Sequence, residues 1–196
     1  MQATENMKKV IMPYVARCIS SDQLLSARRN VYAVKRKALR QEPALDIFLK
    51  ADDPYSYLLI QALESFRSRF TIKLRFHVFY DIDPVMYPKF EMWRKYARYD
   101  AYYLAKLYGF HFPNNDSLPV HDEQTTKQLA LRLVEIENDD DFIVKASVLL
   151  RHFWCHSQPT SPSFDNSNKA ELRLSNNQSL LAQKGHYLGA MIYFEG

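Results

Sequence analysis

The stretch Asp46–Leu59 (DIFLKADDPYSYLL) decides the fold, because it joins the end of a strand to the start of a helix. The apolar run Ala44–Lys50 is typical of a buried central strand. Asp53 followed by Pro54 is a strong helix-start signal, with the aspartate as N-cap and the proline in the first turn. The apolar side chains beyond them recur at helical spacing, at Tyr57, Leu58, Ile60, Leu63 and Phe66. We therefore predict a strand, a tight turn and a helix.

A second strand is expected directly after this helix, over Phe70–Phe79. Apolar side chains alternate there with polar ones: Ile72, Leu74, Phe76 and Val78 with Lys73, Arg75 and His77. This alternation is typical of a strand with one buried face. Because a helix connects the two strands, they should be parallel, with a right-handed crossover.

The rest of the chain predicts helices and one final strand. A basic helical segment covers residues 1–42, with Ser20-Ser21-Asp22 as a break and N-cap before a helix over Gln23–Arg40. Further helices are expected over Pro88–Tyr108, Gln124–Glu137, Asp139–His156 and Lys169–Lys184, with Gly109 and Gly185 as stops. Ala190–Phe194 (AMIYF) is strand-like. This order predicts the α/β class, with the layout of a thioredoxin-like fold that carries a helical insertion.

Three stretches resemble DsbA-like proteins of the thioredoxin superfamily: Asp46–Leu59, Tyr96–Asn114 (YARYDAYYLAKLYGFHFPN) and Lys184–Gly196 (KGHYLGAMIYFEG). They are similar in particular to the branch of 2-hydroxychromene-2-carboxylate isomerase and the kappa-class glutathione transferases. The resemblance covers about residues 44–196 and implies a thioredoxin-like domain over residues 44–83 and 185–196, with an inserted helical domain over 84–184. Residues 1–43, which it does not cover, are expected to form a basic helical extension.

The resemblance places the family's active-site turn at Asp53-Pro54-Tyr55-Ser56. Redox members carry Cys-Pro-x-Cys there, and the isomerase branch carries a Ser-Pro-Tyr-Ser type of turn. Asp53 and Ser56 then stand at the catalytic positions, and Pro54 and Tyr55 at positions that contact substrate or glutathione. A carboxylate at Asp53 with an ordinary pKa of about 3.9 would be ionised and would repel a thiolate. The alternatives are therefore an N-cap alone or a modified catalytic site.

A second part of the family site maps to Gly189-Ala190-Met191-Ile192. The resemblance implies a Gly-Val-Pro-Thr type of sequence there, whose cis-proline faces the turn and whose preceding backbone pairs with a peptide or with glutathione. Met191 stands at the proline position, so we predict a trans bond after Ala190, because a non-proline cis bond costs about 2.5–4 kcal/mol. The family continues with another strand and a helix. We therefore expect these to be missing after Gly196. Either the sequence is a piece of a longer protein, which we favour, or a second copy or another partner covers the last strand's edge.

Other chemistry is expected to be absent or structural. His152 and His156 are one helical turn apart with Cys155 between them, but no second ligand pair accompanies them, so we predict no metal site and a structural thiol. The aromatic side chains Tyr87, Phe90, Trp93, Tyr96, Tyr99, Tyr102, Tyr103 and Tyr108 are expected in the core of the inserted domain. Alternatively, some of them line a pocket for an aromatic or hydrophobic small substrate.

Charge and cysteine content limit the functional classes. Residues 1–43 hold nine lysines and arginines against three acidic residues, within a net charge of +4. We interpret this segment as a solvated amphipathic helix and do not expect nucleic acid as a partner. Cys18 and Cys155 form no CxxC motif, and no apolar stretch is long enough for a membrane span. We predict a cytoplasmic protein.

Three functional hypotheses follow from the sequence. The first is a DsbA-like protein that is not a disulfide oxidoreductase and has a degenerate catalytic site. The second is a glutathione-dependent isomerase or transferase, with Ser56 or Tyr55 contacting the sulfur. The third is an interaction module that uses the basic N-terminal helices.

Overall fold

The computed structural model describes residues 21–81, 89–156 and 168–194. Its elements in chain order are α2 (Asp22–Ala38), β1 (Ala44–Lys50), α3 (Pro54–Arg69), β2 (Lys73–Phe79), α4 (Phe90–Tyr108), the 3₁₀ turn η1 (Asn115–Ser117), α5 (Glu123–Glu135), α6 (Phe142–Cys155), α7 (Asn168–Gln183) and β3 (Met191–Tyr193). These elements agree in kind and order with the sequence prediction. The predictions for residues 1–20, Cys18 and Tyr87 lie outside the described residues.

Backbone contacts divide the chain into two units, residues 1–44 with 193–196 and residues 45–192. In the first unit, α2 begins where Ser21 accepts a hydrogen bond from the backbone of Leu24, which confirms the predicted N-cap. Its last turn carries Lys35, Arg36 and Lys37, where positive charge stabilises the end of a helix dipole. No helix in the described ranges is long and apolar enough to cross a membrane.

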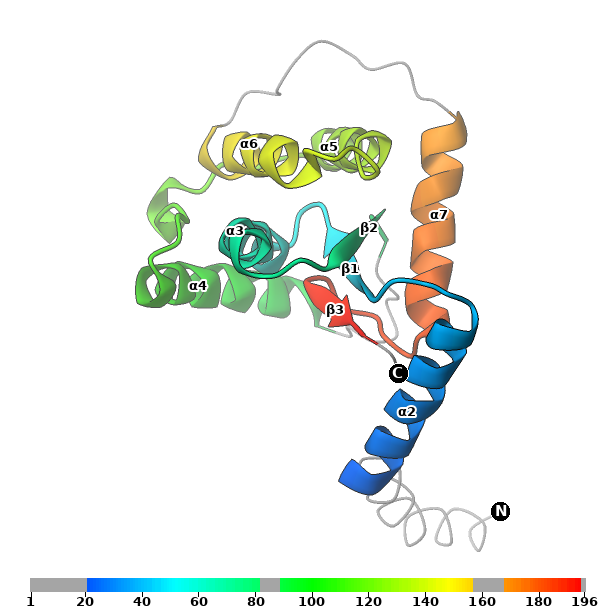
Figure 1. Cartoon of the computed structure of the whole chain (residues 1–196). Coiled ribbons are helices and arrows are strands. Elements are labelled where there is room, and N and C mark those ends of the chain that lie inside the picture. The colour runs from blue at the N-terminus through cyan, green and yellow to red at the C-terminus, as the bar shows by residue number, and fades with distance from the viewer. Residues whose placement is uncertain (1–20, 82–88, 157–167, 195–196) are drawn as a thin grey trace, which may run out of the picture. The chain divides into compact units, whose positions relative to one another are not determined.

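The sheet has the strand order β2-β1-β3 (Figure 1). β1 is central, and its last five residues are buried, as the apolar run predicted. On β1, Asp46 contacts Arg75 and His77 of β2, and Phe48 stacks on His77. Later residues of β1 therefore contact later residues of β2, as in a parallel pair of strands. β3 begins beside the end of β1, because the Ala190 amide and the Lys50 amide donate to one oxygen; β3 therefore runs the opposite way.

The helices of the second unit cover the sheet and one another. α3 packs against α4 and α6, whereas α5 and α7 pack against β2 (Figure 1). The largest fully buried side chains include Trp154, Tyr57, Phe48 and Phe142, and the rings of Phe76 and Phe142 lie 4.2 Å apart. Burial of this apolar surface supplies the main driving force for folding, at about 25 cal/mol per Å².

A buried carboxylate ties β1 to its neighbours. Asp46 accepts hydrogen bonds from Arg75 Nε at 2.8 Å and Nη2 at 3.0 Å, and His77 Nε2 lies 3.0 Å from the same carboxylate. Lys184 Nζ lies 3.4 Å away. Burial by itself raises the pKa of Asp46, but the hydrogen bonds from His77 and Arg75 and the charges of Arg75 and Lys184 outweigh it and lower the pKa to about 2.

Replacing Asp46 by asparagine should lower the free energy of unfolding by about 1–2 kcal/mol at pH 7, a value reduced because Arg75 is partly exposed. A lowered folded pKa gives stability that is present above the unfolded pKa and lost as pH falls toward about 2. The gap between wild type and D46N in urea unfolding should therefore close as pH falls below 4. The exposed Asp116→Asn is the control. A gap that stays constant down to pH 2 would contradict this assignment.

Candidate functional site

The turn after β1 starts α3 as the sequence predicted. Asp53 is the N-cap, and its Oδ2 accepts the Ser56 backbone N–H at 2.8 Å. Pro54 stands in the first turn, where its missing N–H costs nothing. The predicted helix start is therefore confirmed, with the side chain of Asp53 bonded to its own helix.

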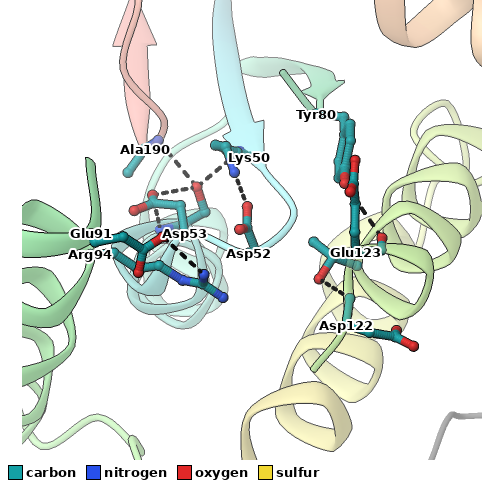
Figure 2. A network of polar contacts seen from close by, with 11 residues as sticks. Lys50, Asp52, Asp53, Tyr80, Glu91, Arg94, Asp122, Glu123 and Ala190 are labelled. Carbon is teal, nitrogen blue, oxygen red and sulfur yellow. Dashed lines mark hydrogen bonds and ion pairs between the residues drawn. The ribbon is translucent and has the colours of Figure 1, made fainter. Parts of the chain in front are cut away.

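Ser56 makes three side-chain hydrogen bonds that join three elements, and Figure 2 labels its partners Lys50, Asp53 and Ala190. Its Oγ accepts the backbone N–H of Lys50 at 3.1 Å, from the end of β1, and that of Ala190 at 3.2 Å, from just before β3. Its hydroxyl donates to Asp53 Oδ2 at 2.8 Å. Ser56 has no exposed surface, so water does not replace these partners. Both lone pairs and the proton of the hydroxyl are thus in use.

Gly189 lets the chain before β3 approach this turn closely. A Cβ at this position would lie 2.8 Å from Asp53 Oδ2 and 3.0 Å from Lys50 Cβ, which is too close for any larger residue without movement of the turn. Ala190 follows with a φ of 54°, in the left-handed region that costs a residue with a Cβ free energy. No described residue has a cis peptide bond, so the predicted trans bond before Met191 is confirmed.

The prediction of an ordinary pKa for Asp53 is wrong. The side chain is buried, and this burial raises its pKa, although the hydrogen bonds from Ser56 and the charge of Lys50 act in the opposite direction. Asp53 Oδ1 is buried without a hydrogen-bond partner among the residues that the structure describes. Sequence reasoning missed this effect because the depth of a turn cannot be read from its residue types.

Lys50 is a second buried charge at the same place, and the sequence analysis did not single it out. Its side chain pairs with Asp52, and the Tyr80 ring centroid lies 5.9 Å from its Nζ (Figure 2). Burial lowers the pKa of Lys50 to about 8, against the opposing charge of Asp53. A lysine at the end of a mostly apolar central strand was the available signal, because lysine is rarely buried without a partner.

Tyr55 connects the turn to α4. Its hydroxyl donates to Asp100 Oδ2 of α4 at 2.8 Å. Burial and this carboxylate raise the pKa of Tyr55, so the phenol stays protonated. The structure thus brings Asp53, Ser56 and Ala190 into direct contact, with Tyr55 bound to α4 beside them.

The prediction that the aromatic side chains of α4 form a core is wrong for four of them. Tyr96, Tyr99, Tyr103 and Tyr108 are exposed. The buried side chains of α4 are the alanines 97, 101 and 105, which recur every fourth residue on one face. Small residues form this face because α4 packs closely against α3, and the larger rings are displaced to the sides.

The histidine and cysteine candidates lie at the end of α6. The rings of His152 and His156 stack at 4.7 Å at the end of α6, and Cys155 is a half-buried free thiol whose pKa is raised by burial. No group of three or more metal-ligating side chains occurs in the described part of the chain.

Comparison with known proteins places this fold. No family model and no curated protein matches the sequence. Among solved structures, 2-hydroxychromene-2-carboxylate isomerase is similar with a TM-score of 0.53 and 15% identity, over 77% of this chain and 88% of that one. A candidate protein disulfide isomerase from Nitrosomonas europaea is similar with a TM-score of 0.51 and 13% identity, over 79% and 89%. The chain therefore has a thioredoxin-like fold of the DsbA kind, as its sequence predicted.

Replacing Ser56 by alanine should lower the free energy of unfolding by about 2 kcal/mol or more, because the buried Lys50 amide and the partly buried Ala190 amide lose their acceptor. Ser68→Ala is the matched control, since Ser68 lies in the same helix but is exposed and bonds only within it. Its effect should stay within about 0.5 kcal/mol. Equal effects of both variants in urea unfolding would show that the three bonds of Ser56 do not stabilise the fold.

Replacing Asp53 by asparagine should change how stability depends on pH. A carboxyl whose folded pKa is raised favours folding while it is protonated, and wild type loses this advantage as pH rises above about 4. Asparagine keeps an N-cap oxygen and does not ionise. D53N should therefore gain stability relative to wild type between pH 4 and 7, below the range in which Lys50 titrates. A relative loss over this range, followed by thermal unfolding, would refute the raised pKa.

Proposed function

We propose that this chain is a DsbA-like thioredoxin-fold protein that does not exchange disulfides, and that its active-site turn is now a structural junction. The observation that carries this proposal is the buried hydroxyl of Ser56, which bonds to Lys50, Ala190 and Asp53 at once. A group whose donor and acceptors are all used by the fold is poorly suited to act on a substrate.

The contacts of Ala190 and Asp53 argue against the alternative of a glutathione-dependent isomerase or transferase for an aromatic or hydrophobic small molecule. By resemblance, the backbone at Ala190 would have to pair with glutathione. Its N–H instead donates to Ser56, and its left-handed φ differs from the extended backbone that such pairing needs. The Asp53 carboxyl occupies the helix N-terminus that would otherwise hold the sulfur. The exposure of four α4 tyrosines also weakens the case for an aromatic pocket there.

The third hypothesis, binding through the basic N-terminal helices, gains no specific support. The basic side chains in the last turn of α2 have a structural role at the helix end. We keep a cytoplasmic location as a proposal that rests on cysteine usage alone.

Two measurements on the wild-type chain test this proposal. Reduced glutathione at millimolar concentration should leave the melting temperature unchanged, whereas a ligand at a hundred times its Kd stabilises by about 2.7 kcal/mol. The protein should also fail to accelerate the reduction of insulin disulfides by dithiothreitol.

The double variant D53C/S56C serves as the positive control, because it restores the Cys-Pro-x-Cys spacing on the same helix start. Its dithiol should show a lowered thiol pKa at residue 53, as expected at a helix N-terminus. Glutathione-dependent stabilisation of wild type, or insulin reduction by it, would overturn the proposal.

A further inference from the structure

A groove of about 720 Å³ lies along the outer edge of β2, away from the active-site turn. We call it the edge groove. It is lined by β2 itself, by the end of α3 and by the turn between α5 and α6; its lining includes Arg67, Lys73, Leu74, Phe76, Asp140 and Ile143. Among the strands that the structure describes, β2 has β1 on one side only, so its other side presents backbone groups with no described strand partner.

One position on this edge is closed by side chains. The backbone N–H of Val78 donates to Glu137 Oε2 at 3.0 Å, and its carbonyl accepts Asn177 Nδ2 at 2.8 Å. Asn177 also donates to Glu137 at 2.8 Å, and Arg173 holds the other carboxylate oxygen at 2.6 Å. Glu137 and Asn177 are both buried, and together they satisfy the backbone N–H and C=O of Val78. Another strand therefore finds no free backbone group of β2 at this residue.

The same geometry leaves the earlier part of the edge open. Backbone groups along a strand point alternately to its two sides. Since the N–H and C=O of Val78 point away from β1, those of Leu74 and Phe76 do so as well, and both residues line the groove. The backbone groups of Leu74 and Phe76 therefore face the edge groove, which is large enough for another chain. Val78, the next residue on this side of β2, is already closed by side chains.

The two faces of β2 define the chemistry that an added strand would need. Leu74 and Phe76 lie on the apolar face, and Ile143 of α6 lines the groove with them. Lys73 and Arg75 lie on the other face and are exposed. Arg75 pairs with Asp46, whereas Lys73 has no acidic partner among the described residues. Asp140 on the opposite wall has no basic side-chain partner there either, and its carbonyl accepts a bond from Arg67 at 2.8 Å.

We propose that the edge groove binds an extended peptide segment of another protein, which adds as a strand at Leu74 and Phe76. Directly opposite side chains of paired strands interact, so the residue facing Lys73 should be acidic and its neighbours apolar. The partner is thus a segment in which apolar and acidic residues alternate. This inference goes beyond the proposed function, because it uses no residue of the active-site turn.

Amide hydrogen exchange followed by NMR tests the open edge directly. In the free protein, the Val78 amide should exchange slowly, while those of Leu74 and Phe76 should exchange at least about tenfold faster. The probe is a short capped peptide in which valine alternates with glutamate. At saturation it should slow the exchange at Leu74 and Phe76 and leave Val78 nearly unchanged.

Matched peptides and variants test the chemistry. A peptide that alternates valine with lysine should bind more weakly, and the valine–glutamate peptide methylated on alternate backbone nitrogens should not bind. Lys73→Glu should weaken binding of the valine–glutamate peptide about threefold and improve that of the lysine peptide. Lys106→Glu, on α4, is the control and should change neither affinity.

Several results would overturn this proposal. Slow exchange at Leu74 and Phe76 in the free protein would mean that the edge is already covered, by this chain if it is independent of concentration and by a second copy if it is not. Equal binding of the methylated peptide would exclude backbone pairing. An unchanged preference in K73E would exclude the acidic segment. None of these results bears on glutathione or disulfide exchange, so the two proposals fail separately.

Discussion

The three hydrogen bonds of Ser56 hold the centre of this fold together. The end of β1, the N-cap of α3 and the residue before β3 each direct one polar group to this hydroxyl. Without it, the backbone amides of Lys50 and Ala190 would lose their acceptor. A buried backbone amide without an acceptor costs about 1–3 kcal/mol, so the hydroxyl stabilises the fold by more than its own bonds suggest. In a redox member, a cysteine at this position would have to remain reactive. A serine can instead be saturated with partners, and here the helix start, the sheet and the close approach of Gly189 all depend on that saturation.

Two buried aspartates at opposite ends of β1 show how the same residue type serves different purposes. Asp46 is surrounded by Arg75, His77 and Lys184, so its ionised form is stabilised in spite of burial. Asp53 has only helix-end hydrogen bonds and the charge of Lys50, which itself pairs with Asp52, and burial prevails. The direction of each pKa shift therefore reflects the balance between burial and charged partners, and burial outweighs the partners at the more deeply buried Asp53. Asp46 therefore links β1 to β2 through charged partners, whereas Asp53 caps the helix that follows it in sequence.

Local sequence signals predicted the fold well and the site only in part. Three signals depend only on residues that are neighbours in sequence: the alternation in β2, the apolar run of β1 and the Asp53-Pro54 helix start. The sequence pattern is therefore sufficient to predict these elements. The burial of Asp53 and Lys50 depends on Gly189, more than a hundred residues away, and no local pattern reports that approach. The aromatic residues of α4 show a further limit. They do recur at helical spacing, as the sequence showed. The face of α4 that packs against α3, however, consists of small alanines, and the four tyrosines lie at the surface.

The two sides of β2 are closed by different means, and this difference explains why its outer side offers a binding edge. On one side, β2 pairs with β1. On its other side, Glu137 and Asn177 close Val78 and stop there, although a second pair of side chains two residues earlier would have closed Phe76 as well. An unpaired edge exposes a protein to aggregation, and charged side chains such as Lys73 reduce that risk. A charge of this kind repels edges that carry lysine or arginine and attracts one that carries glutamate or aspartate. Lys73 therefore protects the edge of β2 against basic strands but not against acidic ones. For this reason, the partner that fits is a segment in which acidic and apolar residues alternate.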